Sequence, residues 1–472
     1  MTIDAVLSPP SSQSLAKRAF IIAALAEGTS VLEGAFLSDD LQVMINALRQ
    51  IGLKVNQSPL HGHIEIVGHK GIFPVDEEYI DVENSLLTVH FLTAALAFSR
   101  GLYRINGDRR VQQFPLGDLI FALNQLGADV RSETAFDTPP LLIHGVHGRC
   151  GISPSSRRYG INVEMSGEER RFAAITGTVS SQYLCGILLA SPLAAELGPV
   201  ELHVVNQLSC DPYVQMTLDL MKEFGVNVEI SPGSKDVLFS KGTTFTIPRE
   251  AEYKSRPYRI EPDASLANVA FAAAAIAGGK VAVPGLRADS IQKELEFIHC
   301  LSRMGCNVTF QQNAAIVRRS ERALLRGISV DMYDMTASIQ TFAVCALFAE
   351  SPSRISNIGH VRRMEPERLP KLFTELRKFG ANIAEFDDGF MILPNKELVP
   401  AVIATEGDPR LAMSLGLIGL RIDGVRIDDP GCIRRAWPSF FEEIGIRGLG
   451  LGAWDSGFVI RGSGLGSRSP LS

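Results

Sequence analysis

The sequence has no apolar run approaching the roughly 18 residues that are needed to cross a lipid bilayer. The apolar segment after Lys17 and Arg18 resembles a short signal peptide. However, similar apolar segments recur five times further along the chain, so we interpret it as the first of several core helices. We therefore expect a cytoplasmic protein that does not bind a membrane.

An excess of basic residues is also lacking. The chain has 46 Lys and Arg against 52 Asp and Glu, which gives a formal net charge of −6. Proteins that bind nucleic acid usually present a strongly basic face. We therefore expect no nucleic-acid partner and a mildly acidic, solvated surface.

The cysteines show no organised spacing. There are seven of them, an odd number, with neither a paired CxxC motif nor the spacing of metal ligands. This pattern is typical of reduced thiols in a cytoplasmic protein.

What the sequence does have is one layout that occurs six times. Each repeat has a polar helix-start signal, an Ala-rich apolar block, a short extended segment, a polar loop and an amphipathic helix that ends in glycine. The helix-ending glycines are Gly52, Gly127, Gly225, Gly305, Gly380 and Gly445. Repeats of this length hold too many elements for a solenoid module. They predict small α/β units that assemble into larger domains.

The grouping of these units by threes predicts two domains. The first would span residues 12–244, and the second would consist of residues 1–11 together with 245–446, so that the N-terminal segment forms a strand with the later half. Residues 447–472 are rich in Gly and Ser and are interpreted as a flexible tail.

The starts of the Ala-rich helices carry residues that cap helix ends. These are Ser11, Ser12, Asn84, Ser85, Ser180, Ser181, Asp263, Ser265, Thr336, Ser338 and Asp408, which Arg410 follows two positions later. Taken singly, each is explained by capping of exposed amide groups. Taken together, several helix starts facing one cleft would attract an anionic ligand, because amide groups and the helix dipole are positive there.

Five segments resemble motifs of one family in order and spacing. They are VSSQYLCGILLASPLA, GDRRVQQFPLGDL, RRMEPERLPKLFTELRKFGANI, GDPRLAMSLGLIGL and DDPGCIRRAWPSFFEEI. The second, for example, is similar to the motif G-D-P-R-M-x-x-R-P-I-G-D-L. Across residues 5 to 446 the chain resembles the 5-enolpyruvylshikimate-3-phosphate (EPSP) synthase family, the 3-phosphoshikimate 1-carboxyvinyltransferases.

This resemblance implies an α/β fold of two similar domains, each built from three βαβαββ units as an inside-out α/β barrel, with the cleft at the hinge. The implied reaction transfers the carboxyvinyl group of phosphoenolpyruvate to a hydroxyl of shikimate 3-phosphate or a related phosphorylated polyol acid, and releases phosphate. It implies no metal or organic cofactor. We expect a monomer with these small molecules as its partners.

The resemblance also assigns site residues. Arg110, Arg368, Arg410 and Arg435 match positions that hold phosphoenolpyruvate, and Glu365 matches the acid beside them. Arginine suits this role because its planar fork binds carboxylate and phosphate at two points. The residues that match the acceptor site are Ser14, Arg18, Ser180, Ser181, Gln182 and Tyr213.

Three positions depart from the family pattern at the chemistry itself. Gln13 and Met364 stand where the family has lysine, and Ala337 stands where it has a catalytic carboxylate. A fourth block, G-N-A-G-T-A-M-R in the family, is ENSLLTVH here, so that His90 replaces an arginine. Asp334 and His360 lie nearby in sequence and are candidate catalytic substitutes.

Two functions remain open. The first is a divergent enolpyruvyl transferase that uses an altered acceptor. The second is a paralogue that binds an anionic metabolite without turnover, since the loss of such groups commonly costs on the order of 10² to 10⁴ in rate for each.

Overall fold

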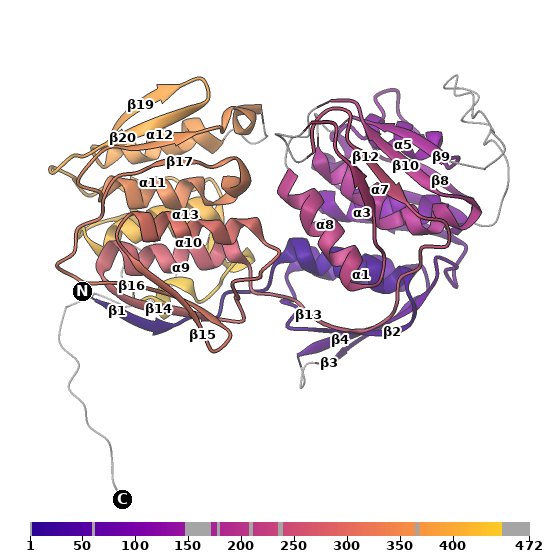
Figure 1. Cartoon of the computed structure of the whole chain (residues 1–472), viewed down its shortest axis with the longest axis horizontal. Coiled ribbons are helices and arrows are strands. Elements are labelled where there is room, and N and C mark those ends of the chain that lie inside the picture. Colours follow the sequence, from indigo (N-terminus) through magenta and orange to yellow (C-terminus); the bar gives the residue numbers. More distant parts are fainter. Residues whose placement is uncertain are drawn as a thin grey trace, which may run out of the picture. The chain divides into compact units, whose positions relative to one another are not determined.

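The computed structural model describes residues 2–58, 62–146, 171–176, 180–206, 211–234, 239–363 and 368–445. The chain divides into two compact bodies (Figure 1). The N-terminal body consists of Pro10–Asp263 with Asp289–Lys293, and the C-terminal body consists of Met1–Pro9, Ala264–Ala288 and the chain from Glu294 onwards. The predicted tail, residues 447–472, lies outside the described residues.

In its described part the N-terminal body has three four-stranded sheets, of order β13-β2-β4-β3, β5-β6-β8-β7 and β11-β12-β10-β9. Their strands are β2 (Glu27–Glu33), β3 (Lys54–Ser58), β4 (His63–His69), β5 (Glu77–Asp81), β6 (Arg100–Asn106), β7 (Asp129–Ser132), β8 (Leu141–Val146), β9 (Arg171–Ile175), β10 (Val200–Val204), β11 (Glu229–Ser231), β12 (Thr244–Ile247) and β13 (Pro257–Arg259). The helices are α1 (Gln13–Leu25), α2 (Asp39–Gln50), α3 (Leu86–Ala97), α4 (Arg109–Gln112), α5 (Gly117–Gln125), α7 (Ser181–Ala194), the 3-10 helix η1 (Ala195–Leu197) and α8 (Asp211–Glu223).

Each of these sheets has the same pairing pattern. In the second sheet β5 pairs parallel with β6, while β8 pairs antiparallel with both β6 and β7. In this sheet helix α3 connects the parallel strands β5 and β6, because a parallel pair needs a crossover, whereas the antiparallel strands β7 and β8 follow each other directly. The resulting order is the expected βαβαββ unit.

The C-terminal body repeats this plan. Its described part has sheets of order β1-β14-β16-β15, β17-β18-β20-β19 and β21-β22. The strands are β1 (Ile3–Val6), β14 (Gly279–Pro284), β15 (Asn307–Gln311), β16 (Ala314–Arg319), β17 (Ser329–Asp331), β18 (Ser353–Ser356), β19 (Asn382–Phe386), β20 (Gly389–Leu393), β21 (Val402–Ile403) and β22 (Arg426–Ile427). The α-helices are α9 (Ala264–Ala277), α10 (Phe297–Arg303), α11 (Ile339–Leu347), α12 (Arg368–Lys378), α13 (Pro409–Gly416) and α14 (Phe440–Glu443). The 3-10 helices are η2 (Lys293–Glu296), η3 (Tyr333–Ser338), η4 (Gly359–Arg363), η5 (Leu417–Leu420) and η6 (Pro430–Arg435).

The chain exchanges two strands between its halves. Strand β1, from the N-terminus, pairs parallel with β14, with Ile3 opposite Gly279. Strand β13 comes directly before α9 in sequence but pairs parallel with β2, with Tyr258 opposite Leu32. The segment 245–263 therefore packs with the N-terminal body. The predicted boundary at residue 244 is too early because β13 completes the β2 sheet.

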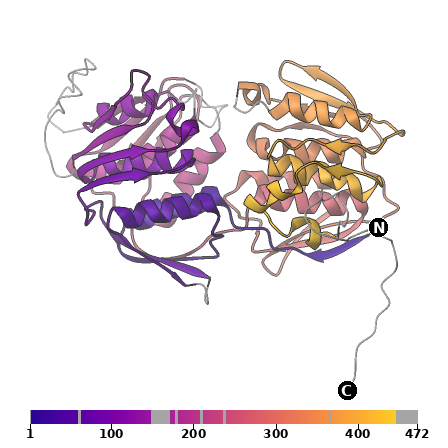
Figure 2. The ribbon, with the colours of Figure 1, turned by 180° about the vertical axis from the view of Figure 1, so that it is seen from behind.

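The Ala-rich blocks form the buried helices α1, α3, α7, α9, α11 and part of α13. All residues of α9 are buried, in line with an apolar surface on every side of the helix. In the N-terminal body α1 lies against the sheet of β2 and β4, as seen from both sides in Figures 1 and 2. The predicted core helices are thus confirmed.

The amphipathic helices end as expected at the six glycines. Gly52, Gly127, Gly225, Gly305, Gly380 and Gly445 all have positive φ, between 73° and 106°. Glycine adopts this left-handed conformation without the steric cost that a side chain brings.

Two further observations concern composition. The cysteines that the structure describes, Cys185, Cys300, Cys306, Cys345 and Cys432, are buried and form no disulfide. Of the helices described, none has both the length and the apolar character that a membrane crossing requires.

Candidate active-site residues

In the N-terminal body three buried helices begin close together. Lys17, on the second turn of α1, donates from Nζ to Ser85 Oγ at 2.7 Å, and Ser85 is the N-cap of α3. Arg18 donates from Nη2 to Oε1 of Gln182, in the first turn of α7, at 2.9 Å. The starts of α1, α3 and α7 therefore meet.

Arg18 gathers most of the predicted acceptor residues around one guanidinium group. It donates to Ser14 O at 2.9 Å, to Tyr213 O at 3.4 Å and to Thr217 Oγ1 at 2.7 Å, in addition to Gln182. Its Cζ lies 5.1 Å from the centre of the Phe91 ring.

Arg18 is fully buried, yet no carboxylate within the described residues forms an ion pair with it. A buried cation without a counter-ion is costly and favours an anionic ligand. Ser180 and Ser181 belong to the same cluster. Ser180 is the N-cap of α7, and its Oγ accepts from the amide of Gln182 at 3.2 Å, while Ser181 is buried.

Gln13 occupies one of the substituted positions and is bound to the protein itself. Its Nε2 donates to Phe36 O at 3.1 Å, and its Oε1 accepts from Ser38 Oγ at 2.7 Å. Ser38 is the N-cap of α2. The glutamine therefore fastens α1 to the start of α2.

Lys17, one helical turn further along, was missed by sequence reasoning. Its side chain is 0% exposed, and Nζ lies 2.5 Å from Asp40 Oδ2. Burial lowers the pKa of Lys17, and Asp40 opposes this shift. A lysine within an otherwise apolar helix face was the signal that could have indicated this buried pair.

An aromatic cluster contains two residues, His90 and Phe114, that the resemblance aligns with arginines of the family motifs. His90 replaces the arginine of the G-N-A-G-T-A-M-R block, and Phe114 replaces the second arginine of the G-D-P-R-M-x-x-R motif. The His90 ring centre lies 5.5 Å from that of Phe114 and 5.0 Å from that of Tyr183. Burial lowers the pKa of His90 to about 3, so the imidazole is neutral. The first of these substitutions was noted in the sequence, and the second was not.

In the C-terminal body the starts of α9, α11 and α13 also meet. Asn268 on α9 donates to Oγ of Ser338, the N-cap of α11, at 2.9 Å. Gln340 on α11 lies 3.4 Å from Oδ2 of Asp408, the N-cap of α13.

Arg410 connects the start of α13 to the start of α9. Its Nη2 donates to Ser265 Oγ, in the first turn of α9, at 3.0 Å. One predicted donor-binding arginine therefore lies where three helix starts converge.

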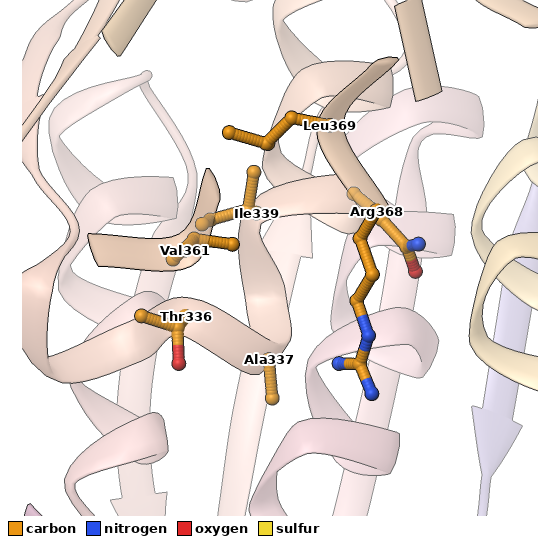
Figure 3. A pocket seen from close by; sticks show the side chains of 7 residues that line it. Thr336, Ala337, Ile339, Val361, Arg368 and Leu369 are labelled. Carbon is orange, nitrogen blue, oxygen red and sulfur yellow. The ribbon is translucent and has the colours of Figure 1, made fainter. Parts of the chain in front are cut away.

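A small pocket is lined by both Arg368 and Ala337, and position 337 is one of those that depart from the family pattern. It is lined by Thr336, Ala337, Ile339, Gln340, Val361, Arg368 and Leu369. Its volume of about 20 Å³ is sufficient for a water molecule. In Figure 3 the Arg368 side chain extends alongside the helix start that carries Ala337.

Glu294 approaches the same helix start from η2. Its Oε1 accepts from the amide of Ala337 at 3.1 Å, and its Oε2 accepts from Ser338 Oγ at 2.7 Å. No motif pointed to this residue, because its contacts join segments more than forty positions apart in sequence.

The other predicted site residues are spread over both bodies. Arg110 is exposed on α4 of the N-terminal body, and Arg435 is exposed at the end of η6 in the C-terminal body. Asp334 is exposed on η3, and the ring of His360 lies 4.9 Å from that of Tyr333. Glu365 and Met364 lie outside the described residues. Within the described part of the chain, His, Cys, Asp and Glu side chains form no group of three that could hold a metal ion.

The βαβαββ units, the exchanged strands and the arginines at converging helix starts define a class of two-domain α/β protein. A sequence profile described as EPSP synthase (3-phosphoshikimate 1-carboxyvinyltransferase) matches residues 1–444. The chain belongs to the EPSP synthase family.

Individual relatives agree with this assignment. The chloroplastic 3-phosphoshikimate 1-carboxyvinyltransferase of Brassica napus is 36% identical over 456 residues, covering 94% of this chain and 83% of that protein. The 3-phosphoshikimate 1-carboxyvinyltransferase of Trichormus variabilis is 34% identical and covers 94% and 96%. An EPSP synthase structure from Acinetobacter baumannii superimposes with a TM-score of 0.76 over 95% of this chain and 96% of that one, at 19% identity. The structural likeness supports the fold.

Proposed function

We propose that this protein transfers the enolpyruvyl group of phosphoenolpyruvate to a hydroxyl of shikimate 3-phosphate or a closely related phosphorylated acceptor. In the overall reaction the acceptor oxygen bonds to the central carbon of phosphoenolpyruvate, whose bond to the phosphate oxygen breaks. The hydroxyl proton leaves with phosphate or passes to solvent. Family membership and relatives that carry this activity in their names support the proposal.

The observation that carries the acceptor half of this proposal is the buried Arg18 cluster. The guanidinium lies among Ser14, Gln182 and Tyr213, next to the amide-rich start of α7. A phosphate monoester is an anion of the size and charge that such a site favours. We assign the acceptor phosphate to this cluster, with Ser180 and Ser181 as further ligands.

The donor half rests on Arg110, Arg368, Arg410 and Arg435. Phosphoenolpyruvate carries both a carboxylate and a phosphate, and arginine binds each of them at two points. Arg410 is already held at a convergence of helix starts, where the helix dipoles favour an anion. We assign the catalytic acid beside them to Glu365, with Asp334 and His360 as further candidates for proton transfer.

Phosphate release is the direct test. The full chain is incubated with phosphoenolpyruvate and shikimate 3-phosphate, and both inorganic phosphate and the enol ether product are measured. We expect both products only when both substrates are present. A panel of other hydroxylated phosphate esters follows if this acceptor fails, and the absence of turnover with all of them would contradict the proposal.

One substitution separates donor binding from general damage. Arg368→Ala removes a proposed ligand of phosphoenolpyruvate, and we expect kcat/KM for this substrate to fall about 100-fold, mainly through KM. Arg377→Ala on the same helix removes an exposed pair with Glu385 at 2.7 Å and is the matched control. Equal kinetics of the two variants would contradict the assignment of Arg368.

The second candidate function is binding of an anionic metabolite without turnover. It is favoured by the neutral cluster of His90, Phe114 and Tyr183, which replaces two family arginines, and by the bonding of Gln13 to Phe36 and Ser38. Calorimetry with shikimate 3-phosphate and with phosphoenolpyruvate distinguishes the two functions. Binding without phosphate release would establish the second function, whereas the absence of binding would remove it.

A further inference from the structure

We propose that Glu294 is a catalytic carboxylate of this protein and takes up the proton of the acceptor hydroxyl. This inference rests on the proposed transferase function. The reaction needs a group that accepts this proton while the acceptor oxygen bonds to the central carbon of phosphoenolpyruvate and the bond to phosphate breaks. Glu294 then returns the proton to phosphate or to solvent.

The first reason is the position of the Glu294 carboxylate at the start of α11. Its two oxygens accept from the Ala337 amide at 3.1 Å and from Ser338 Oγ at 2.7 Å. Position 337 itself is alanine and provides no proton carrier. Ala337 also lines the pocket that contains Arg368, so the Glu294 carboxylate and a proposed donor-binding arginine flank the same helix start.

The second reason is that this carboxylate is held rigidly. Asn268, which is fully buried, donates from Nδ2 to Glu294 O at 2.7 Å and to Ser338 Oγ at 2.9 Å. One side chain of α9 thereby fixes both η2 and the start of α11. Groups that transfer protons need such positioning by neighbours that are themselves fixed.

The third reason is that Glu294 remains accessible. It is only half-buried, whereas Ser338 and Asn268 are buried. Asp408 is another carboxylate among these helix starts, but its Oδ1 accepts the amides of Arg410 and Leu411 as the cap of α13. One Asp408 oxygen thus caps its own helix and the other lies 3.4 Å from Gln340 Nε2, while Glu294 reaches the start of α11 from a separate segment.

A purely structural role for Glu294 is the competing explanation. Ser338, the N-cap of α11, makes no capping hydrogen bond with its own side chain, and Glu294 accepts from the start of this helix instead. A cap requires only a hydrogen-bond acceptor, so glutamine should replace glutamate with little loss. A proton carrier requires the carboxylate itself. A substitution that keeps the hydrogen-bond acceptor but removes the carboxylate therefore distinguishes the two explanations.

The experiment measures full kinetics and thermal unfolding of Glu294→Gln in the full chain. Glu296→Gln, an exposed carboxylate of the same 3-10 helix, is the matched control. We expect Glu294→Gln to lower kcat on the order of 10² to 10³ while KM for phosphoenolpyruvate stays within about threefold. The acid limb of the pH profile of kcat/KM should disappear in this variant and persist in the control.

A second variant distinguishes the loss of the proton carrier from a folding defect. Ala337→Asp in the Glu294→Gln background places a carboxylate at the neighbouring position. We expect kcat of this double variant to be at least tenfold higher than kcat of Glu294→Gln alone. If Glu294→Gln matches the control in rate, or loses rate and melting temperature together without rescue by Ala337→Asp, Glu294 is not the proton carrier. An inactive wild type would instead refute the transferase function itself.

Discussion

At the residue scale, several positions that the family resemblance assigns to charged residues hold buried neutral or self-paired groups in this chain. His90 is the clearest case, because it is 3% exposed and its ring nitrogens have no hydrogen-bond partner among the residues that the structure describes. Its pKa falls to about 3 through burial, with a smaller contribution from the charge of Lys17. An imidazole in this setting is tolerated only in its uncharged form.

This burial predicts a pH-dependent stability. Below about pH 6.5 the unfolded chain protonates His90, whereas the folded chain does so only near pH 3, so stability falls as the pH drops between these values. At pH 5 the loss from this residue is about 2 kcal/mol relative to pH 7. Urea denaturation at both pH values, for the wild type and His90→Leu, measures it.

The leucine variant should lose less stability than the wild type between pH 7 and pH 5. His69→Gln, at an exposed histidine, should retain the wild-type difference. If His90→Leu showed the same loss as the wild type, the assignment of the neutral imidazole would be wrong.

At the element scale, the sites depend on how closely the buried helices pack. Helix α7 crosses α3 at Gly186, where an added Cβ would lie 3.0 Å from His90 O and 3.5 Å from Cδ1 of Phe91. The backbone oxygen cannot move without shifting α3. This crossing holds α3 and α7 close together, and Ser85 and Ser181 lie at the starts of these two helices.

A larger side chain at this crossing should therefore destabilise the N-terminal body. We expect Gly186→Val to lower the free energy of unfolding by about 1 to 3 kcal/mol, because the helices must separate. Lys222→Val, at an exposed position of α8, tests the effect of valine on a helix alone and should cost less than about 1 kcal/mol. Urea denaturation compares the two, and similar losses would mean that the crossing is not tight.

At the scale of the whole molecule, each body contains one edge strand that comes from a distant part of the sequence. Strand β1 supplies the edge of the β14 sheet, and Ile3 is 4% exposed in the core of the C-terminal body. Strand β13 supplies the edge of the β2 sheet in the same way.

Deletion of residues 2–6 should loosen the C-terminal body. Removal of the Ile3 side chain and the strand hydrogen bonds costs about 2 to 4 kcal/mol. Hydrogen exchange followed by mass spectrometry should show faster exchange in β14, with the β6 and β10 sheets unchanged. Asp4→Ser with Val6→Ser changes only exposed positions of β1 and is the control. Unchanged exchange in β14 after the deletion would contradict the role of β1.

The sequence by itself determined the repeated units, the buried Ala-rich helices and the helix-ending glycines. These features depend on local periodicity and on the conformational freedom of glycine, which a single segment carries. The family resemblance also grouped Arg18, Gln182 and Tyr213 as predicted acceptor residues, and the structure brings these three into contact.

Only the tertiary structure decided the position of β13, the pairing of Lys17 with Asp40, the packing of His90 against Phe114, and the contact of Glu294 with Ala337. Each of these joins residues from separate elements. Periodicity within one segment cannot specify such a contact, because which side chains meet is fixed by how the helices and sheets pack.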